Sequence, residues 1–461
     1  MQEKKYHFWI TGCQMNYADA RRVATRLEKY GYRSTSRAED ADVIVLETCT
    51  VRQQSEDKAY NKLHALRPLK DDHPHKTIAV MGCVVGVRGN EHLEKTFPFV
   101  DVFMEPASDG SPLISHLMQS DALTVEQDGT TQRHLYQDGE VILPVHQRGH
   151  MVAAPISIVY GCSHACTFCI IPQKRGKERS RPVGAIVSEA RSLVQQGVKE
   201  VMLLGQIVDR YGYDVPDGPD LADLLHAVHD VEGLERIRFL TSHPNYLSDR
   251  ILYAVSDLPR VMPQIEVPVQ AGDDEVLENM RRGYTADEYR ELVARIRDII
   301  PDAAVHCDII VGFPGETEEQ FRRTYDLLEE LRLEKLHLAR YSPRKGTVSQ
   351  RNMEDDVPEE EKWRRFELLE ELNERISEEK MREYLGQTVP VLVEGKRKKR
   401  WYGREPRGKL VFFEDDRKLR GKMVDVLVTH TGAWSMSGKP ADVADVVPAG
   451  KATDSIPLKM L

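Results

Sequence analysis

Short apolar or β-branched segments alternate with amphipathic helical segments along residues 1 to about 384 of this 461-residue chain. Such alternation predicts parallel β-sheets flanked by helices, and a chain of this length is expected to form two or three domains. Three strand segments fall in the first part of the chain: His7–Thr11, Asp42–Glu47 and Thr77–Met81. The sequence therefore predicts an N-terminal parallel α/β domain over residues 1–123.

A longer series of the same kind fills residues 151–384. Its six expected strands are Ala154–Val159, Glu200–Leu204, Arg236–Leu240, Gln264–Val267, Ala304–Val311 and Lys335–Ala339. Six βα units suit a partial or complete TIM-like barrel, a (β/α)6 arrangement with its site at the C-terminal strand ends. A charged helix, Pro358–Tyr384, ends this segment. A polar connector with one strand-like run, Glu140–Val145, is expected over residues 124–150.

The pattern changes after residue 385 to short strands and turns, which predicts a small β-barrel over residues 385–448. Its expected strands are Thr388–Glu394, Lys409–Glu414 and Met423–Thr429, and residues 449–461 are expected to be a disordered tail. Five consecutive basic residues, Lys396–Arg400, precede Trp401 and Tyr402, and Phe412 and Phe413 follow. Cations track phosphates, whereas aromatic rings either stack on unpaired bases or fill a small barrel's core. The segment indicates nucleic-acid binding, although the whole chain has a net charge of −10.

The cysteine content is informative because no stretch approaches the roughly 18 apolar residues of a membrane span and the N-terminus lacks a signal-peptide pattern. We therefore expect a cytoplasmic protein without membrane contact, in which disulfides are disfavoured and metal binding or catalysis is favoured. The seven cysteines are Cys13, Cys49, Cys83, Cys162, Cys166, Cys169 and Cys307.

Three of them, Cys162, Cys166 and Cys169, lie within eight residues in the segment YGCSHACTFCIIP, directly after an expected strand. Three thiolates on so short a loop can converge on one metal centre. One reading is a four-iron cluster with one iron that has no protein ligand. The alternatives are structural zinc with His164 as fourth ligand, and inert buried thiols.

Another three, Cys13, Cys49 and Cys83, are far apart in sequence but each follows an expected strand. Because the C-terminal ends of parallel strands share one edge of a sheet, these cysteines can meet there and hold a second cluster. Each taken singly would more often be a small buried apolar residue. Cys307 lies inside an expected strand and is interpreted as core.

The Cys162–Cys169 spacing resembles the signature of the radical S-adenosylmethionine superfamily, which has an aromatic residue before the third cysteine, here Phe168. The resemblance implies a [4Fe-4S] cluster that binds S-adenosylmethionine and cleaves it to a 5′-deoxyadenosyl radical. It also implies positions that contact S-adenosylmethionine. These are Phe168, Gly205, Gln206, Ser242, Gln270 and Gly312.

The chain to about Val447 resembles the methylthiotransferase family, in which a cluster domain, a radical domain and an RNA-binding TRAM module follow one another. GCQMN (Gly12–Asn16) resembles the branch acting on isopentenyladenosine beside the anticodon of tRNA, and the family's motifs RFLTSHP, MRRGYT, YSPRKGT and WSMSG are also matched. The resemblance implies two [4Fe-4S] clusters, the second on Cys13, Cys49 and Cys83. It further implies sulfur insertion and methylation at C2 of the adenine with two S-adenosylmethionine equivalents, tRNA as partner, and an electron donor such as flavodoxin or ferredoxin.

Several positions depart from the family pattern. Glu47 stands in place of Asn, Val84–Val85 in place of Ala-Gln, Ile207–Asp209 in place of Asn-Val-Asn, and Glu266 in place of His. All six cluster cysteines are present, so the reaction class is expected to hold. The substrate stays open between isopentenyladenosine, threonylcarbamoyladenosine in tRNA and an aspartate of a ribosomal protein. A zinc-stabilised RNA-binding protein without catalysis is the alternative from another class.

Overall fold

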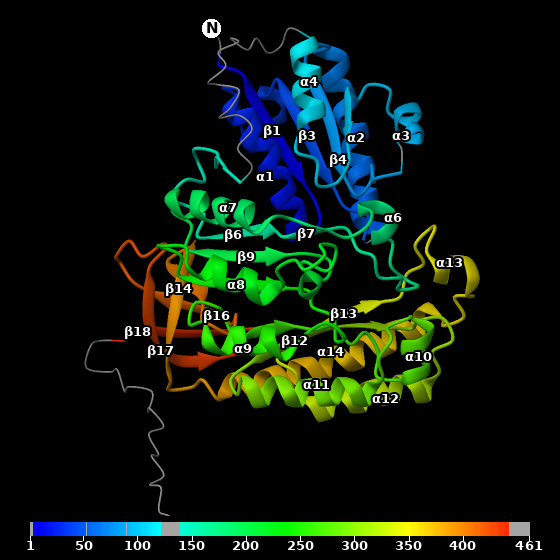
Figure 1. Ribbon diagram of the computed structural model, residues 1–461, viewed down its shortest axis with the longest axis vertical. Coiled ribbons are helices and arrows are strands. Elements are labelled where there is room, and N and C mark those ends of the chain that lie inside the picture. Colours follow the sequence, from blue (N-terminus) through cyan, green and yellow to red (C-terminus); the bar gives the residue numbers. More distant parts are fainter. Residues whose placement is uncertain (1–2, 52, 89, 121–138, 442–461) are drawn as a thin grey trace, which may run out of the picture. The chain divides into compact units, whose positions relative to one another are not determined.

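The computed structural model describes residues 3–51, 53–88, 90–120 and 139–441 (Figure 1). The chain divides into two units, with the boundary between Asn373 and Glu374. Most of the expected connector and the expected tail lie outside the described residues. Within the described ranges, no helix is both long and apolar enough to cross a membrane.

The N-terminal part of the first unit is a five-stranded parallel sheet, as the alternating pattern predicts. Its strands β1 (Lys5–Ile10), β2 (Arg33–Ser34), β3 (Val43–Thr48), β4 (Thr77–Gly82) and β5 (Val102–Met104) lie in the order β2-β1-β3-β4-β5. This is the flavodoxin-like order, in which the chain switches direction across the sheet between β1 and β3. Ligands of such sheets bind outside the strand ends at that switch point.

Both faces of this sheet are buried, because successive strand residues point to opposite sides. Val43 and Val45 pack with helices α1 (Gln14–Lys29) and α4 (Ser111–Gln119). Ile44 and Leu46 pack on the other face with α2 (Gln53–Asp72) and α3 (Glu91–Thr96). The continuous apolar run of β3 is thus explained by a strand covered on two sides.

The second part of this unit contains the six expected strands, all parallel. They are β6 (Ala153–Ser157), β9 (Glu200–Leu204), β10 (Arg236–Leu240), β11 (Gln264–Glu266), β12 (Ala304–Val311) and β13 (Lys335–Arg340). They form two three-stranded groups, and Met262 N–H donates to the Ile237 carbonyl at 2.9 Å where the groups adjoin. The neighbour order follows the chain order, so the prediction of a partial barrel is confirmed.

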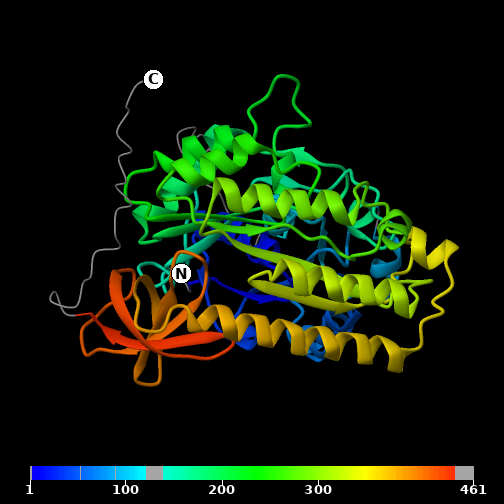
Figure 2. The same ribbon diagram turned by 90° about the horizontal axis from the view of Figure 1, so that it is seen from below.

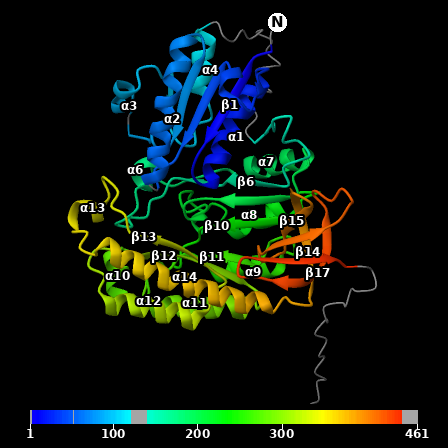
Figure 3. The same cartoon turned by 180° about the vertical axis from the view of Figure 1, so that it is seen from behind.

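Helices cover the outer face of these strands, as Figure 3 shows for α11 (Ala286–Ile299) and α12 (Glu318–Leu331) beside β12 and β13. The same layer includes α7 (Val183–Gln195), α8 (Leu221–His229), α9 (Asp249–Asp257) and α10 (Asp274–Asn279). Capping boxes fix where three of them begin, with Asp220, Thr285 and Thr317 as N-caps. Short elements α6 (Ile171–Arg175), β7 (Val159–Tyr160), β8 (Arg179–Ser180) and α13 (Val348–Asn352) shape the loops. The charged helix is α14 (Glu359–Arg382), within two residues of its predicted ends.

One predicted strand, Glu140–Val145, is wrong. Side chains take up its backbone groups: the Val141 N–H donates to Ser192 Oγ at 3.2 Å and the Leu143 N–H to Gln196 Oε1 at 2.8 Å. The Ile142 N–H donates to Thr25 Oγ1 at 3.1 Å. Because these donors are satisfied by helix side chains, the extended segment has no strand partner.

The second unit contains a closed five-stranded barrel, drawn in orange and red in Figure 2, as predicted. Its strands are β14 (Thr388–Arg397), β15 (Arg400–Arg404), β16 (Leu410–Glu414), β17 (Met423–Thr431) and β18 (Ser435–Pro440). Val391, Val411, Phe413, Val426 and Met436 fill its core. The sequence did not predict β15 or β18.

Candidate functional site

The loop that carries Cys162, Cys166 and Cys169 is fixed by backbone geometry. Gly161 has φ of +68°, and a Cβ there would lie 2.2 Å from the Lys177 carbonyl oxygen, so only glycine fits before Cys162. Thr167 donates from its backbone N–H to the Met280 carbonyl at 3.1 Å and from Oγ1 to the Asn279 carbonyl at 2.8 Å. The protein itself therefore holds the loop in place.

The thiols of this loop need a positively charged partner in order to ionise, and a metal cluster is such a partner. Burial raises the pKa of Cys162 to about 11 and that of Cys169 to about 12, so thiolates here require a positive partner. Arg282 supplies one, because its Nη1 donates to Cys166 Sγ at 3.2 Å. A buried cation beside a ligand sulfur offsets the negative charge of a thiolate-bound cluster.

Four of the expected contact positions share the edge at which this loop lies. Gly205 directly follows β9, Ser242 comes two residues after β10, Gln270 four after β11, and Gly312 directly after β12.

Gln270 has a φ of +77° and is held by its backbone, whose N–H donates to the Asp308 carbonyl at 3.0 Å. Gly312 has a φ of +70°, and a Cβ there would approach Lys362 Cγ to 2.3 Å. Glycine is thus required at position 312.

The remaining two positions differ from this arrangement. Phe168 is half-buried within the cysteine loop. Gln206 turns toward the N-terminal domain, where its Nε2 donates to Met15 Sδ at 2.9 Å. The structure therefore connects the end of β9 to the GCQMN segment.

An aromatic and cationic cluster beside the loop was not predicted. The rings of His164 and His243 lie 4.5 Å apart, and the Arg210 guanidinium lies 4.5 Å from the Tyr246 ring centre. Burial, followed by the charge of Arg282, lowers the pKa of His243 to about 2, so this ring is neutral. His243 and Arg282 belong to the RFLTSHP and MRRGYT motifs, which could have marked them without revealing their contacts.

The N-terminal cysteines follow the ends of three adjacent strands at the switch point of their sheet. Asn16 Nδ2 donates to the carbonyls of Thr11 at 2.8 Å and Thr48 at 2.9 Å, which ties the end of β1 to that of β3. The Cys83 N–H donates to the Thr48 carbonyl at 2.9 Å, which adds the end of β4. A Cβ on Gly12 would lie 2.4 Å from Cys49 Cβ. The turns that carry Cys13, Cys49 and Cys83 are therefore packed against one another.

Arg175 links the two cysteine groups. It ends helix α6, six residues after Cys169, and is buried. Its Nε donates to Cys83 Sγ at 3.3 Å, its Nη1 to Asp19 Oδ2 at 3.0 Å, and its Nη2 to Asn16 Oδ1 at 2.9 Å. Each cysteine group thus has one buried arginine that donates to a sulfur.

Glu47, where the family pattern has Asn, is fully buried beside this group. Burial, followed by the charge of Asp19, raises the pKa of its carboxyl well above the usual range, so the group is neutral. Within the described part of the chain, neither carboxyl oxygen has a hydrogen-bond partner. A Cβ on Gly82 would lie 2.4 Å from Oε1, so glycine before Cys83 makes room for this side chain.

The spacing of the cysteine ligand atoms can be compared with that of a tetrahedral zinc site. Thiolates on one tetrahedral zinc lie about 3.8 Å apart, because each Zn–S bond is about 2.3 Å. Among the described residues, neither cysteine group has all its ligand atoms within 4.8 Å of one another, with or without His164. A four-iron cluster spaces its thiolates farther apart, since each binds a different iron. In this arrangement, neither cysteine group forms a closed zinc site.

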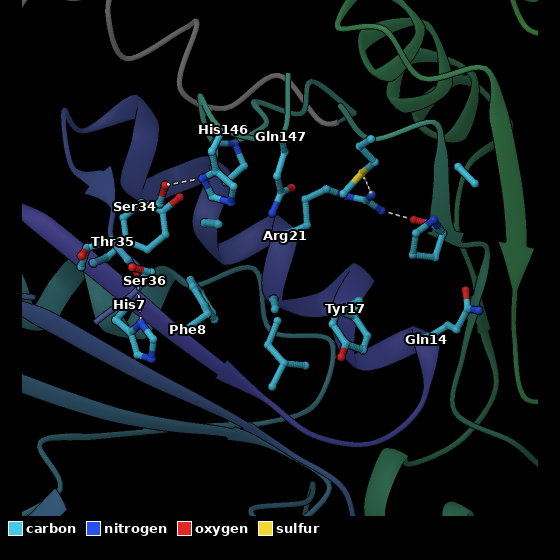
Figure 4. A pocket seen from close by; sticks show the side chains of 18 residues that line it. His7, Phe8, Gln14, Tyr17, Arg21, Ser34, Thr35, Ser36, His146 and Gln147 are labelled. Carbon is cyan, nitrogen blue, oxygen red and sulfur yellow. Dashed lines mark hydrogen bonds between the residues drawn. The ribbon is translucent and has the colours of Figure 1, made fainter. Parts of the chain in front are cut away.

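A cavity of about 870 Å³ lies beside β1 and α1, away from the cysteine sulfurs. Figure 4 shows His7, Phe8, Tyr17, Arg21 and His146 around it. No cysteine lines it, and the Arg21 guanidinium donates to the Pro155 carbonyl. It is not part of the cluster sites.

The Arg175–Asp19 pair predicts a large stability effect. Replacing Arg175 with methionine leaves a buried carboxylate without its cation, and we expect the free energy of unfolding to fall by about 3 kcal/mol. The control R67M breaks the exposed Arg67–Asp71 pair and should cost no more than about 0.5 kcal/mol. Urea unfolding of both variants measures the difference, and equal losses would show that the buried pair does not stabilise the fold.

Comparison with known proteins identifies three modules. Residues 156–328 match the Radical SAM superfamily, residues 5–105 the Uncharacterized protein family UPF0004, and residues 382–440 the TRAM domain. The tRNA-2-methylthio-N(6)-dimethylallyladenosine synthase of Roseiflexus sp. (strain RS-1) is 46% identical over 95% of this chain and 90% of its own length. The synthase of the same name from Chloroflexus aurantiacus is 44% identical over 95% and 92%.

Solved structures share the fold. The radical S-adenosylmethionine methyltransferase TsrM from Kitasatospora setae, with cobalamin and a [4Fe-4S] cluster bound, superposes with a TM-score of 0.55 at 15% identity. The match covers 76% of this chain and 77% of that one. Membership of the superfamily implies one [4Fe-4S] cluster and S-adenosylmethionine. The chain therefore belongs to the radical S-adenosylmethionine methylthiotransferases, in the branch of the tRNA-2-methylthio-N(6)-dimethylallyladenosine synthases.

Proposed function

We propose that the chain is an enzyme that replaces the C2 hydrogen of N6-isopentenyladenosine, next to the anticodon of tRNA, with a methylthio group. The observation that carries this proposal is the pair of cysteine groups at the C-terminal strand ends of two parallel sheets, linked by Arg175. The names of relatives at 41–46% identity over 94–95% of the chain support the same substrate.

We assign one [4Fe-4S] cluster to Cys162, Cys166 and Cys169 and a second to Cys13, Cys49 and Cys83. In each group, at least one buried thiol and one arginine that donates to a sulfur suit a negatively charged cluster. When bound, the clusters and S-adenosylmethionine would supply the 5′-deoxyadenosyl radical, the inserted sulfur and the methyl group.

The chain's own residues position the cofactor and exclude water. Phe168, Gly205, Gln206, Ser242, Gln270 and Gly312 remain the proposed contacts for S-adenosylmethionine. The neutral His243 ring lies beside the loop, together with the Tyr246 ring and the Arg210 guanidinium stacked on it. Arg175 donates to Cys83 Sγ and is itself held by hydrogen bonds to Asp19 and Asn16, so we interpret it as a positioning residue.

The small barrel supplies an RNA surface in this proposal. Its four aromatic residues divide into two kinds: Trp401 and Phe413 are buried in the core, whereas Tyr402 and Phe412 are half-buried. Arg397 lies 5.0 Å from the Tyr402 ring centre and Arg400 lies 5.1 Å from that of Phe412. Paired cations and rings can hold phosphates and unpaired bases, as an anticodon loop presents them.

The remaining assignments follow from the substrate. A tRNA substrate places the enzyme in the cytoplasm, and reduction of the cluster calls for a donor such as flavodoxin or ferredoxin. We propose domain limits at residues 1–123, 151–384 and 385–448, with the connector at 124–150.

Nucleoside analysis tests the proposal. We expect tRNA from a strain lacking this protein to have lost 2-methylthio-N6-isopentenyladenosine and to accumulate N6-isopentenyladenosine, measured by mass spectrometry of digested tRNA. The wild-type chain should restore the product and a C166A variant should not. Unchanged methylthio nucleosides, in a strain with no second enzyme of this type, would contradict the proposal.

A further inference from the structure

Three potential metal ligands lie on neighbouring strands of the partial barrel. They are Glu266 on β11, His306 on β12 and His337 on β13, and their ligand atoms all lie within 4.8 Å of one another. Glu266 is the register partner of His306, and His337 is the partner of Asp308. The three side chains therefore emerge from the same face of the sheet, since side chains alternate along a strand.

This face is the inner face of the barrel. On β12, Cys307, Ile309 and Val311 are fully buried, and Cys307 contacts Tyr289 of α11, which belongs to the outer helix layer. His306 and Asp308 alternate with these residues and so point to the opposite, inner side. The three ligands do not belong to the hydrophobic layer between strands and helices.

We propose that Glu266, His306 and His337 bind one divalent transition-metal ion, such as Zn²⁺ or Fe²⁺, at a site separate from both clusters. Two imidazoles and one carboxylate form a donor set typical of these ions, with further positions left for water or substrate. Glu266 is one of the departures from the family pattern, in which a His stands at this position. Because of this difference, the proposed site has a carboxylate ligand where the family pattern has an imidazole.

Surrounding residues contact two of the three ligands. Thr241 Oγ1 donates to Glu266 Oε1 at 3.2 Å, and Gln264 Nε2 lies 3.4 Å from His306 Nδ1. Such outer partners orient ligand side chains. Asp308 and Lys335, one of each charge, are the other ionisable groups acting on Glu266.

The site adjoins one proposed S-adenosylmethionine contact, because the Ser242 N–H donates to the Glu266 carbonyl at 2.9 Å, and it is distant from another, Gly312. His306 lies on β12 and precedes Gly312, which directly follows that strand, by six residues; a strand rises about 3.3 Å per residue, so the two are up to about 20 Å apart. An ion here would cross-link β11, β12 and β13 without displacing a cluster ligand.

Manganese binding tests this inference, because Mn²⁺ prefers nitrogen and oxygen ligands to thiolates. The cluster-loaded chain, with its clusters oxidised and diamagnetic, is titrated with Mn²⁺, and free Mn²⁺ is followed by electron paramagnetic resonance. We expect one bound Mn²⁺ per chain, displaced by Zn²⁺, which binds such donors more tightly. Mn²⁺ binding is measured without enzyme activity. The experiment can therefore refute the metal site without refuting the proposed function, and the nucleoside analysis can do the reverse.

Substitutions locate the ion. E266Q and H337Q should each weaken Mn²⁺ binding at least about 10-fold. His337 is exposed, so H337Q carries little risk to folding. The matched control H226Q, which removes an exposed histidine on α8, should leave the affinity unchanged. Absence of stoichiometric Mn²⁺, failure of Zn²⁺ to displace it, or equal affinity in E266Q and wild type would overturn the inference.

Discussion

Replacing Cys162, Cys166 and Cys169 together with alanine is expected to halve the iron content, from about eight to about four atoms per chain, and to abolish 5′-deoxyadenosine formation. The loop is held by the Thr167 hydrogen bonds, so loss of the thiols removes the ligands without unfolding the loop. Iron analysis and chromatography of the S-adenosylmethionine products measure the two effects.

The matched control for this variant is C307A. Cys307 is fully buried, but it lies within β12 and contacts Tyr289. Its replacement should leave the iron content at about eight atoms. If the triple variant still cleaved S-adenosylmethionine, the assignment of the radical-forming cluster to Cys162, Cys166 and Cys169 would be wrong.

The triple replacement of Cys13, Cys49 and Cys83 with alanine is expected to give a different result. It should also contain about four iron atoms, but it should still cleave S-adenosylmethionine while forming no methylthio product. The reason is that these cysteines follow β1, β3 and β4 of a separate sheet, and Arg282 beside Cys166 is unaffected.

The two variants thus separate radical formation from sulfur insertion. Iron content, 5′-deoxyadenosine and modified tRNA are measured on the same preparations. If the second variant formed the methylthio product, sulfur insertion would not depend on Cys13, Cys49 and Cys83.

Most of the fold was predictable because short apolar or β-branched segments alternate with helical segments along the chain. Among the missed strands, β2 and β5 are only two and three residues long, and β15 begins inside the basic run. In β15, Trp401 and Gly403 are buried while Arg400 and Arg404 are exposed. The charged residues of the run concealed this alternation of buried and exposed positions in the sequence. Glu140–Val145 has a strand-like composition, but its backbone N–H groups donate to side chains of α1, of α7 and of the residue that follows α7.

The site was predictable only in part. Cysteine spacing and strand order indicated both groups, since equivalent strand ends share an edge. Arg175 could not be predicted, because its partners Asp19 and Asn16 precede it by 156 and 159 residues. Glu266 was noted as a departure, but its proximity to His306 and His337 arises from strand register.

The central claim is that one chain directs its radical to C2 of a tRNA adenosine. The most direct measurement uses tRNA with deuterium at C2 of N6-isopentenyladenosine and follows the label by mass spectrometry. The prediction is deuterium in 5′-deoxyadenosine and a methylthio group on the same adenine. Unlabelled 5′-deoxyadenosine alongside methylthiolated tRNA would contradict it.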